Sequence, residues 1–135
     1  MQIVIVGSGN VASVLGRLCK QNGHQLLQIV SRNASNAKEL ADELNCAYAD
    51  YSGDMNSHAE LYLVAVADTA LFDLNQNFSL VNKLILHTAG SVSKDVLKTI
   101  SVNYGVLYPL QSLRKEMQYA NDIPMLIDGD RKSVV

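Results

Sequence analysis

Apolar and polar positions along this chain follow strand-like and helix-like patterns in turn. The first apolar run, Ile3–Val6, is continuous and β-branched, which is typical of a strand covered on both faces. Apolar residues then recur at helical spacing over residues 10–21, and Asn22-Gly23 predicts the end of that helix. Gln25–Val30 follows as a second strand. The pattern thus opens with a strand–helix–strand unit.

The same alternation continues to the end of the chain. We expect Ser35 to cap a second helix, whose Ala37, Leu40, Ala41 and Leu44 share one apolar face. Further strands are predicted at 47–49, 61–66, 83–87, 105–108 and 125–127. The polar stretch 52–58 is expected to be a loop or a poor helix, 69–80 a short helix or a turn, and 93–100 a helix. This order predicts the α/β class: a doubly wound, mostly parallel sheet of the Rossmann type with helices on both faces.

Composition limits the classes of protein to which the chain can belong. Its 135 residues are 48% apolar, enough for one compact domain spanning 1–135. A net charge of −2 gives no attraction to phosphate backbones or anionic membranes, so nucleic acid is not an expected partner. The longest apolar run, Leu61–Ala67, is far shorter than the roughly 20 residues that span a bilayer. Cys19 and Cys46 form neither a disulfide framework nor a metal cluster, and we expect a cytoplasmic, metal-free protein.

The turn after the first strand carries a dinucleotide-binding pattern, Gly7-Ser8-Gly9-Asn10-Val11-Ala12. Gly7 permits a sharp turn, Gly9 lets the backbone approach a pyrophosphate, and Ala12 lets the helix pack closely on the strand. The amides of residues 8–11 and the positive helix end are then expected to face the phosphates. Such a short pattern occurs by chance, but here a predicted strand precedes it and an amphipathic helix follows. The alternative is a tight turn that binds nothing.

Ser31-Arg32-Asn33 ends the second strand, where NAD-specific sites usually carry an Asp or Glu for the ribose hydroxyls. A carboxylate would repel a 2′-phosphate, whereas a hydroxyl, a guanidinium and an amide would bind it. The sequence therefore favours NADP(H) over NAD(H). Alternatively, Arg32 is a solvated loop residue and its neighbours lead into the next helix, and both interpretations can hold together.

Three later strand ends are expected at the same edge of the sheet. Ala67-Asp68 would pass beneath the nicotinamide ribose, although Asp68 could equally cap a helix. In His87-Thr88-Ala89-Gly90-Ser91, His87 could donate a proton to a substrate carbonyl or imine, or be a buried structural residue. Thr88, Ser91 and Gln111 are candidate substrate-binding residues.

These segments, together with Leu63–Asp68 and Gly105–Gln111, resemble in order a family of Rossmann-like NADP oxidoreductases. That family is similar to pyrroline-5-carboxylate reductase and to the deazaflavin-dependent NADP oxidoreductases. The resemblance implies an N-terminal cofactor domain, followed by a helical domain that dimerises and completes the active site. Since this chain ends just past its last predicted strand, we expect that helical domain to be absent and the chain to be inactive alone.

Two functions from different classes remain open on the sequence. The first is the cofactor half of a reductase that transfers hydride to or from a small carbonyl or imine, with the nicotinamide supplying the hydride chemistry. The second is a non-catalytic module that senses or binds NADP(H). Turnover of imines and ketones by the whole protein would separate the two.

Overall fold

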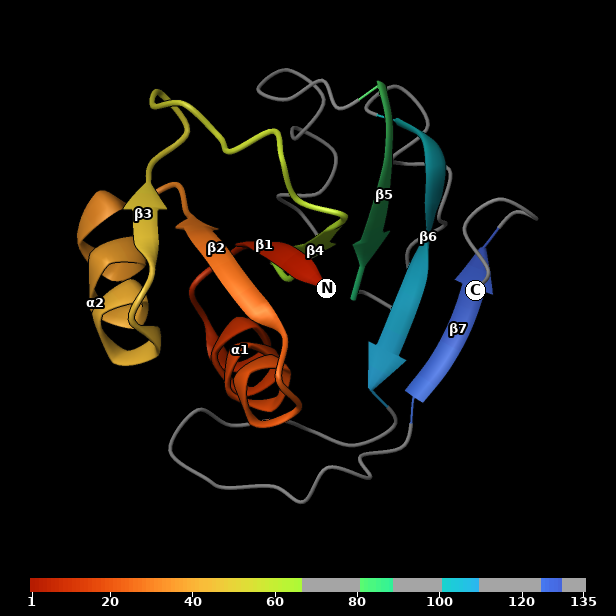
Figure 1. Cartoon of the computed structure of the whole chain (residues 1–135), viewed down its shortest axis with the longest axis horizontal. Helices are drawn as coiled ribbons and strands as arrows, with labels where there is room; N and C mark the ends of the chain where they lie inside the picture. Colours follow the sequence, from red (N-terminus) through yellow and green to blue (C-terminus); the bar gives the residue numbers. More distant parts are fainter. Residues whose placement is uncertain (67–80, 89–100, 110–124, 130–135) are drawn as a thin grey trace.

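The computed structural model describes residues 1–66, 81–88, 101–109 and 125–129. Their elements in chain order are β1 (Gln2–Val6), α1 (Asn10–Gln21), β2 (Gln25–Val30), α2 (Ala34–Leu44), β3 (Ala47–Ala49), β4 (Leu61–Val64), β5 (Val81–His87), β6 (Ser101–Pro109) and β7 (Met125–Gly129). The strands form one sheet in the order β3-β2-β1-β4-β5-β6-β7, with β3 at one end and β7 at the other (Figure 1).

Every neighbouring pair of strands from β3 to β6 is parallel, and only the last pair, β6 with β7, is antiparallel. The order steps outward from β1 in both directions, which is the Rossmann arrangement. The predicted α/β fold with a mostly parallel sheet is therefore confirmed. The helices predicted within 69–80 and 93–100 lie outside the described residues.

Several boundaries differ from those expected. β4 ends at Val64, two residues earlier than the apolar run suggested, while β5 begins at Val81 and β6 at Ser101, earlier than expected. Apolar content continues through Ala65 and Val66, but the chain leaves the ladder there. A continuous apolar run does not by itself mark where strand pairing stops.

Both described helices pack on the same face of the sheet. Buried side chains of α1 and α2 share one core cluster with alternate residues of β1, including Ile3 and Ile5. The four residues predicted to form the inner face of α2 are all buried: Ala37, Leu40, Ala41 and Leu44. The opposite face has its own cluster, which includes Val4, Val6 and the fully buried Tyr62. The sheet is thus covered on both sides, as the β-branched β1 run predicted.

The predicted cap of the second helix is wrong. The helix begins at Ala34, and the Oδ1 atom of Asn33 accepts a hydrogen bond from the N–H of Asn36 at 3.1 Å. Ser35 therefore lies inside the first turn instead of before it. Asn33 has the extended backbone and short acceptor side chain that an N-cap requires.

A polar loop follows β3 and is held against the second face of the sheet. The buried Gln28 side chain donates to the Asp54 carbonyl at 2.9 Å and accepts from the Asn56 N–H at 2.7 Å. The Tyr62 hydroxyl donates to the Asn56 carbonyl at 2.6 Å. These bonds satisfy buried polar groups that would otherwise destabilise the fold. They also confirm that residues 52–58 form a loop.

Candidate functional site

The ends of four parallel strands meet at one edge of the sheet, as predicted. Backbone hydrogen bonds join the residues that leave these strands: Gly7 N–H to Val30 O at 2.7 Å, Ala65 N–H to Val6 O at 2.7 Å and Thr88 N–H to Val64 O at 3.1 Å. The predicted turn after β1, the end of β2 and the end of β5 are thus neighbours. In sheets of this type, ligands bind at this carboxyl edge.

Gly7 and Gly9 have different roles in the turn between β1 and α1. Gly7 adopts φ +127°, and a Cβ atom there would collide with the Ala65 carbonyl group. Gly9 has an ordinary φ of −87°, and a Cβ atom there would meet no atom within 4 Å. Packing within the protein therefore requires glycine at position 7. At position 9 the backbone faces open space, where a ligand could lie directly against it.

The start of α1 is not capped by a side chain. Gly9 is the N-cap residue, and α1 has no side-chain cap hydrogen bond and no acidic residue in its first turn. The Ser13 hydroxyl donates to the Gly9 carbonyl at 2.8 Å, so it does not compete for the first amides. A helix start without a side-chain cap, together with the positive end of the helix dipole, favours an anion at this position. Asn10 and Val11 begin the helix there, and Ala12 is fully buried beneath it.

Ser8 in the turn and Ser31 at the end of β2 lie in direct contact. Their Oγ atoms are 3.0 Å apart, and either can be the donor. The N–H of Asn33 also donates to Ser31 Oγ, at 3.4 Å. Because Asn33 uses Oδ1 to cap α2, its Nδ2 group is not part of that cap. The predicted group Ser31, Arg32 and Asn33 therefore lies beside the glycine turn, and Asn33 also caps the helix.

Arg32 is exposed and lies near Tyr51. Burial raises the pKa of the Tyr51 phenol above its ordinary value, and the Arg32 charge offsets part of that rise. No carboxylate is present in the segment 31–33. The end of β2 therefore presents a positive charge and hydroxyl and amide groups at the carboxyl edge.

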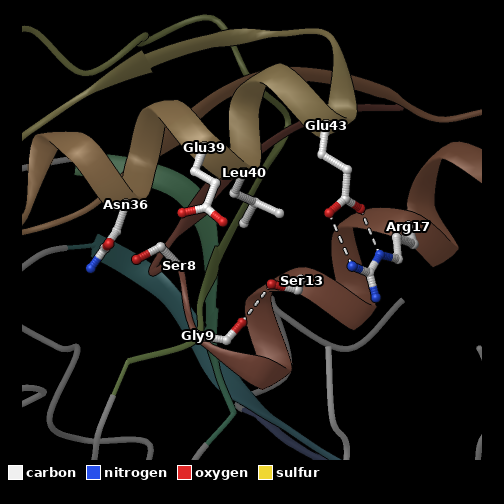
Figure 2. Close-up of a pocket in the computed structure, with 8 residues that line it drawn as sticks. All are labelled: Ser8, Gly9, Ser13, Arg17, Asn36, Glu39, Leu40 and Glu43. Atoms are coloured by element: carbon white, nitrogen blue, oxygen red, sulfur yellow. Dashed lines mark hydrogen bonds and ion pairs between the residues drawn. The ribbon is translucent and has the colours of Figure 1, made fainter. Parts of the chain in front are cut away.

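A pocket of about 440 Å³ lies between the start of α1 and the exposed side of α2 (Figure 2). Its lining residues are Ser8, Gly9, Ser13, Arg17, Asn36, Glu39, Leu40 and Glu43. Arg17 and Glu43 face each other across it, with Nε to Oε2 at 2.6 Å and Nη2 to Oε1 at 3.0 Å. The contribution of α2 to this pocket was not predicted, because charged residues on an exposed helix face have the pattern of a solvated surface.

His87 and Thr88 lie at the end of β5, as predicted, and both are buried. His87 has no exposed surface. It lies on the same side of β5 as Ile85, which belongs to the core cluster on the face of the sheet opposite the two helices. The Thr88 hydroxyl donates to the Val64 carbonyl at 3.4 Å. A catalytic role for His87 and a substrate contact for Thr88 remain predictions. Ala67, Asp68, Ser91 and Gln111 lie outside the described residues.

No group of three or more His, Cys, Asp or Glu side chains is placed to hold a metal ion in the part of the chain that the structure describes. Among the helices described, none has the length and apolar character needed to cross a membrane.

Comparison with known families gives the chain its classification. Residues 2–90 match the family described as NADP oxidoreductase, coenzyme F420-dependent. The chain belongs to this family. The matched region includes the glycine turn, the end of β2 and Leu63–Asp68, which carried part of the resemblance in the sequence, whereas Gly105–Gln111 lies outside it. No curated protein sequence matches the chain.

Solved structures agree with this classification. A "putative NADP oxidoreductase" from Bacteroides fragilis is 33% identical, with a TM-score of 0.84 over 96% of this chain and 51% of its own. A 1-pyrroline-5-carboxylate reductase from Streptococcus pyogenes is 21% identical, with a TM-score of 0.76 over 100% of this chain and 50% of its own. A prephenate dehydrogenase from A. aeolicus, in complex with NAD⁺, is 9% identical, with a TM-score of 0.76 over 99% of this chain and 52% of its own. At these lower identities the last two show the fold alone. The chain spans about half the length of these solved relatives.

Proposed function

We propose that this chain binds NADP(H) across the carboxyl edge of its sheet, as the cofactor half of an oxidoreductase. The observation that carries the proposal is the turn at Gly7–Ala12. It leaves open space at Gly9 and uncapped amides at the start of α1, in a chain of the NADP oxidoreductase family. The pyrophosphate would lie on those amides, where the helix dipole stabilises negative charge.

The proposal assigns the adenosine 2′-phosphate to Ser31, Arg32 and Asn33. The Arg32 guanidinium would neutralise the phosphate charge, and the Ser31 hydroxyl and the Asn33 Nδ2 group would complete its hydrogen bonds. Support comes from the lack of a carboxylate in this segment and from the contact between Ser31 and the glycine turn. Binding of NADP(H) in preference to NAD(H) follows from these charges.

We further propose that the whole enzyme transfers hydride to or from a small carbonyl or imine compound. The bound nicotinamide would supply the hydride, and the chain's own contribution would be to hold and orient the cofactor. Because the solved relatives are about twice as long, the substrate site is assigned in part to a region beyond the one matched here, through which the protein would also dimerise. Ala67 and Asp68 are assigned to the ribose beside the nicotinamide.

Titration of the chain with NADPH and with NADH tests the cofactor assignment. The expected result is saturable binding of both, with NADPH bound about tenfold or more tightly, since each tenfold step is about 1.4 kcal/mol of binding free energy. Equal affinities would overturn the NADP assignment, and binding of neither would overturn the site.

Oxidation of NADPH by a panel of imines and ketones, measured on a protein of the relatives' full length, tests the hydride transfer. Tight binding without turnover would instead support a sensing module.

A further inference from the structure

Charge is unevenly distributed in the pocket between α1 and α2. Arg17 supplies its positive charge, but two hydrogen bonds at 2.6 and 3.0 Å commit that charge to Glu43. Glu39 lies one helical turn before Glu43 and lines the same pocket. Among the residues that the structure describes, Glu39 forms no ion pair. The pocket therefore carries a carboxylate whose charge is not neutralised nearby.

This carboxylate lines the same pocket as Ser8, the residue of the glycine turn that contacts Ser31. Figure 2 shows the Glu39 side chain extending from α2 into the pocket, with its carboxylate between Ser8 and Leu40. Ser8 Oγ in turn lies 3.0 Å from Ser31 Oγ. A group bound at the Ser31 hydroxyl would therefore lie next to Ser8, which lines the same pocket as Glu39.

We infer that Glu39 is a specificity-determining residue that weakens binding of the 2′-phosphate and so limits the preference for NADP(H) over NAD(H). The inference rests on the proposed function, because it needs a dinucleotide at this edge of the sheet. A phosphomonoester carries a charge of roughly −1.5 to −2 at neutral pH, and a carboxylate in the same open pocket repels it. NAD(H) has a neutral hydroxyl at that position and is not repelled. Arg32 attracts the phosphate and Glu39 opposes it, and the ratio of the two affinities reflects both.

Substitution of Glu39 by Gln removes the charge and keeps the size of the side chain. The exposed position and similar helix propensity should leave the fold intact. We expect the ratio of NADPH to NADH affinity to rise about three- to tenfold at low ionic strength, and by less at high salt because the repulsion is screened. Calorimetric titration of both cofactors at two salt concentrations measures this ratio.

Asp42→Asn is the matched control, since it removes one negative charge from the same helix. Asp42 pairs with Lys38 at 2.8 Å and does not line the pocket. Its substitution should leave the ratio of NADPH to NADH affinity within about twofold of the ratio in the unsubstituted protein, as expected for an exposed charge outside the site. An unchanged ratio in Glu39→Gln, or an equal rise in Asp42→Asn, would overturn the inference while leaving the proposed function intact. Failure of the unchanged protein to bind either dinucleotide would overturn both.

Discussion

The hydroxyl oxygens of Ser8 and Ser31 lie 3.0 Å apart, which joins the glycine turn after β1 to the end of β2. The two residues are 23 positions apart in the chain and come together because β1 and β2 are neighbouring parallel strands. One part of the site is proposed to hold the pyrophosphate and the other the 2′-phosphate. Their contact makes the two parts a single surface.

Substitution of Ser31 by Asp should reverse the cofactor preference. A carboxylate at the end of β2 repels a 2′-phosphate and accepts hydrogen bonds from ribose hydroxyls. We expect NADPH affinity to fall about tenfold or more, and NADH affinity to be retained or to rise. Titration of both cofactors measures the effect, with Ser31→Ala as the control that removes the hydroxyl without adding charge. An affinity ratio equal to that of Ser31→Ala would contradict the assignment of the 2′ position.

Substitution of Arg32 by Ala should weaken NADPH binding about tenfold and NADH binding by about twofold or less, because only NADPH carries the extra phosphate. The same variant should raise the pKa of Tyr51 further above its ordinary value, since it removes the Arg32 charge that offsets part of the effect of burial. Titration of the Tyr51 resonance by NMR measures that rise independently of the cofactor. Equal loss of both cofactors would indicate damage to the fold and contradict the role given to Arg32.

Substitution of Gly7 by Ala should destabilise the protein strongly. The added methyl group would collide with the Ala65 carbonyl group, and the φ of +127° is itself unfavourable for any residue but glycine. We expect the free energy of unfolding in urea to fall by about 2–4 kcal/mol. Gly23→Ala is the control, because Gly23 also has a positive φ of +80° but open space at its Cβ position. Equal losses in the two variants would refute a packing role for Gly7.

The stability of the protein should fall in alkali in a way that depends on Cys19. Burial raises the pKa of the Cys19 thiol from its ordinary 9.0 to about 11, against a smaller opposing effect of the positive N-terminus. As the pH rises, the Cys19 thiol loses its proton in the unfolded chain before it does so in the folded one. The free energy of unfolding is therefore unaffected by this thiol below about pH 9 and falls by up to about 2 kcal/mol by about pH 11. Urea unfolding across this range should show a shallower decline for Cys19→Ala. Equal declines in the two proteins would contradict a raised pKa for the Cys19 thiol.

Much of the fold and the centre of the site could be predicted from the sequence, because short-range patterns determine both. The bounds of α1 and β2 follow from apolar periodicity and from the Asn22-Gly23 ending, and the structure has them as predicted. The sequence predicted that Gly7 makes the turn and that Gly9 lies against a ligand, but it could not distinguish a glycine that packing requires from one that packing does not require. That distinction depends on Ala65, more than fifty positions away, whose carbonyl group packs against Gly7.

Other features depend on contacts that local patterns do not show. Ser35 and Asn33 are both good N-cap residues, and the extended backbone at Asn33, with the helix beginning at Ala34, makes Asn33 the cap. The pocket on α2 escaped prediction because Glu39 and Glu43 have the spacing of an ordinary solvated helix face. Only the packing of α2 beside the start of α1 places Glu39 near Ser8.

The turn at Gly9 is proposed to hold the cofactor pyrophosphate, and calorimetric titration of Gly9→Ala with NADPH tests this role. The added methyl group meets no protein atom within 4 Å. The free energy of unfolding should therefore change by less than about 1 kcal/mol, the usual scale of an N-cap change. We expect NADPH and NADH affinities both to fall about tenfold or more, because the methyl group would occupy the space of the pyrophosphate. A stable Gly9→Ala protein that binds NADPH as tightly as the unchanged chain would contradict this role.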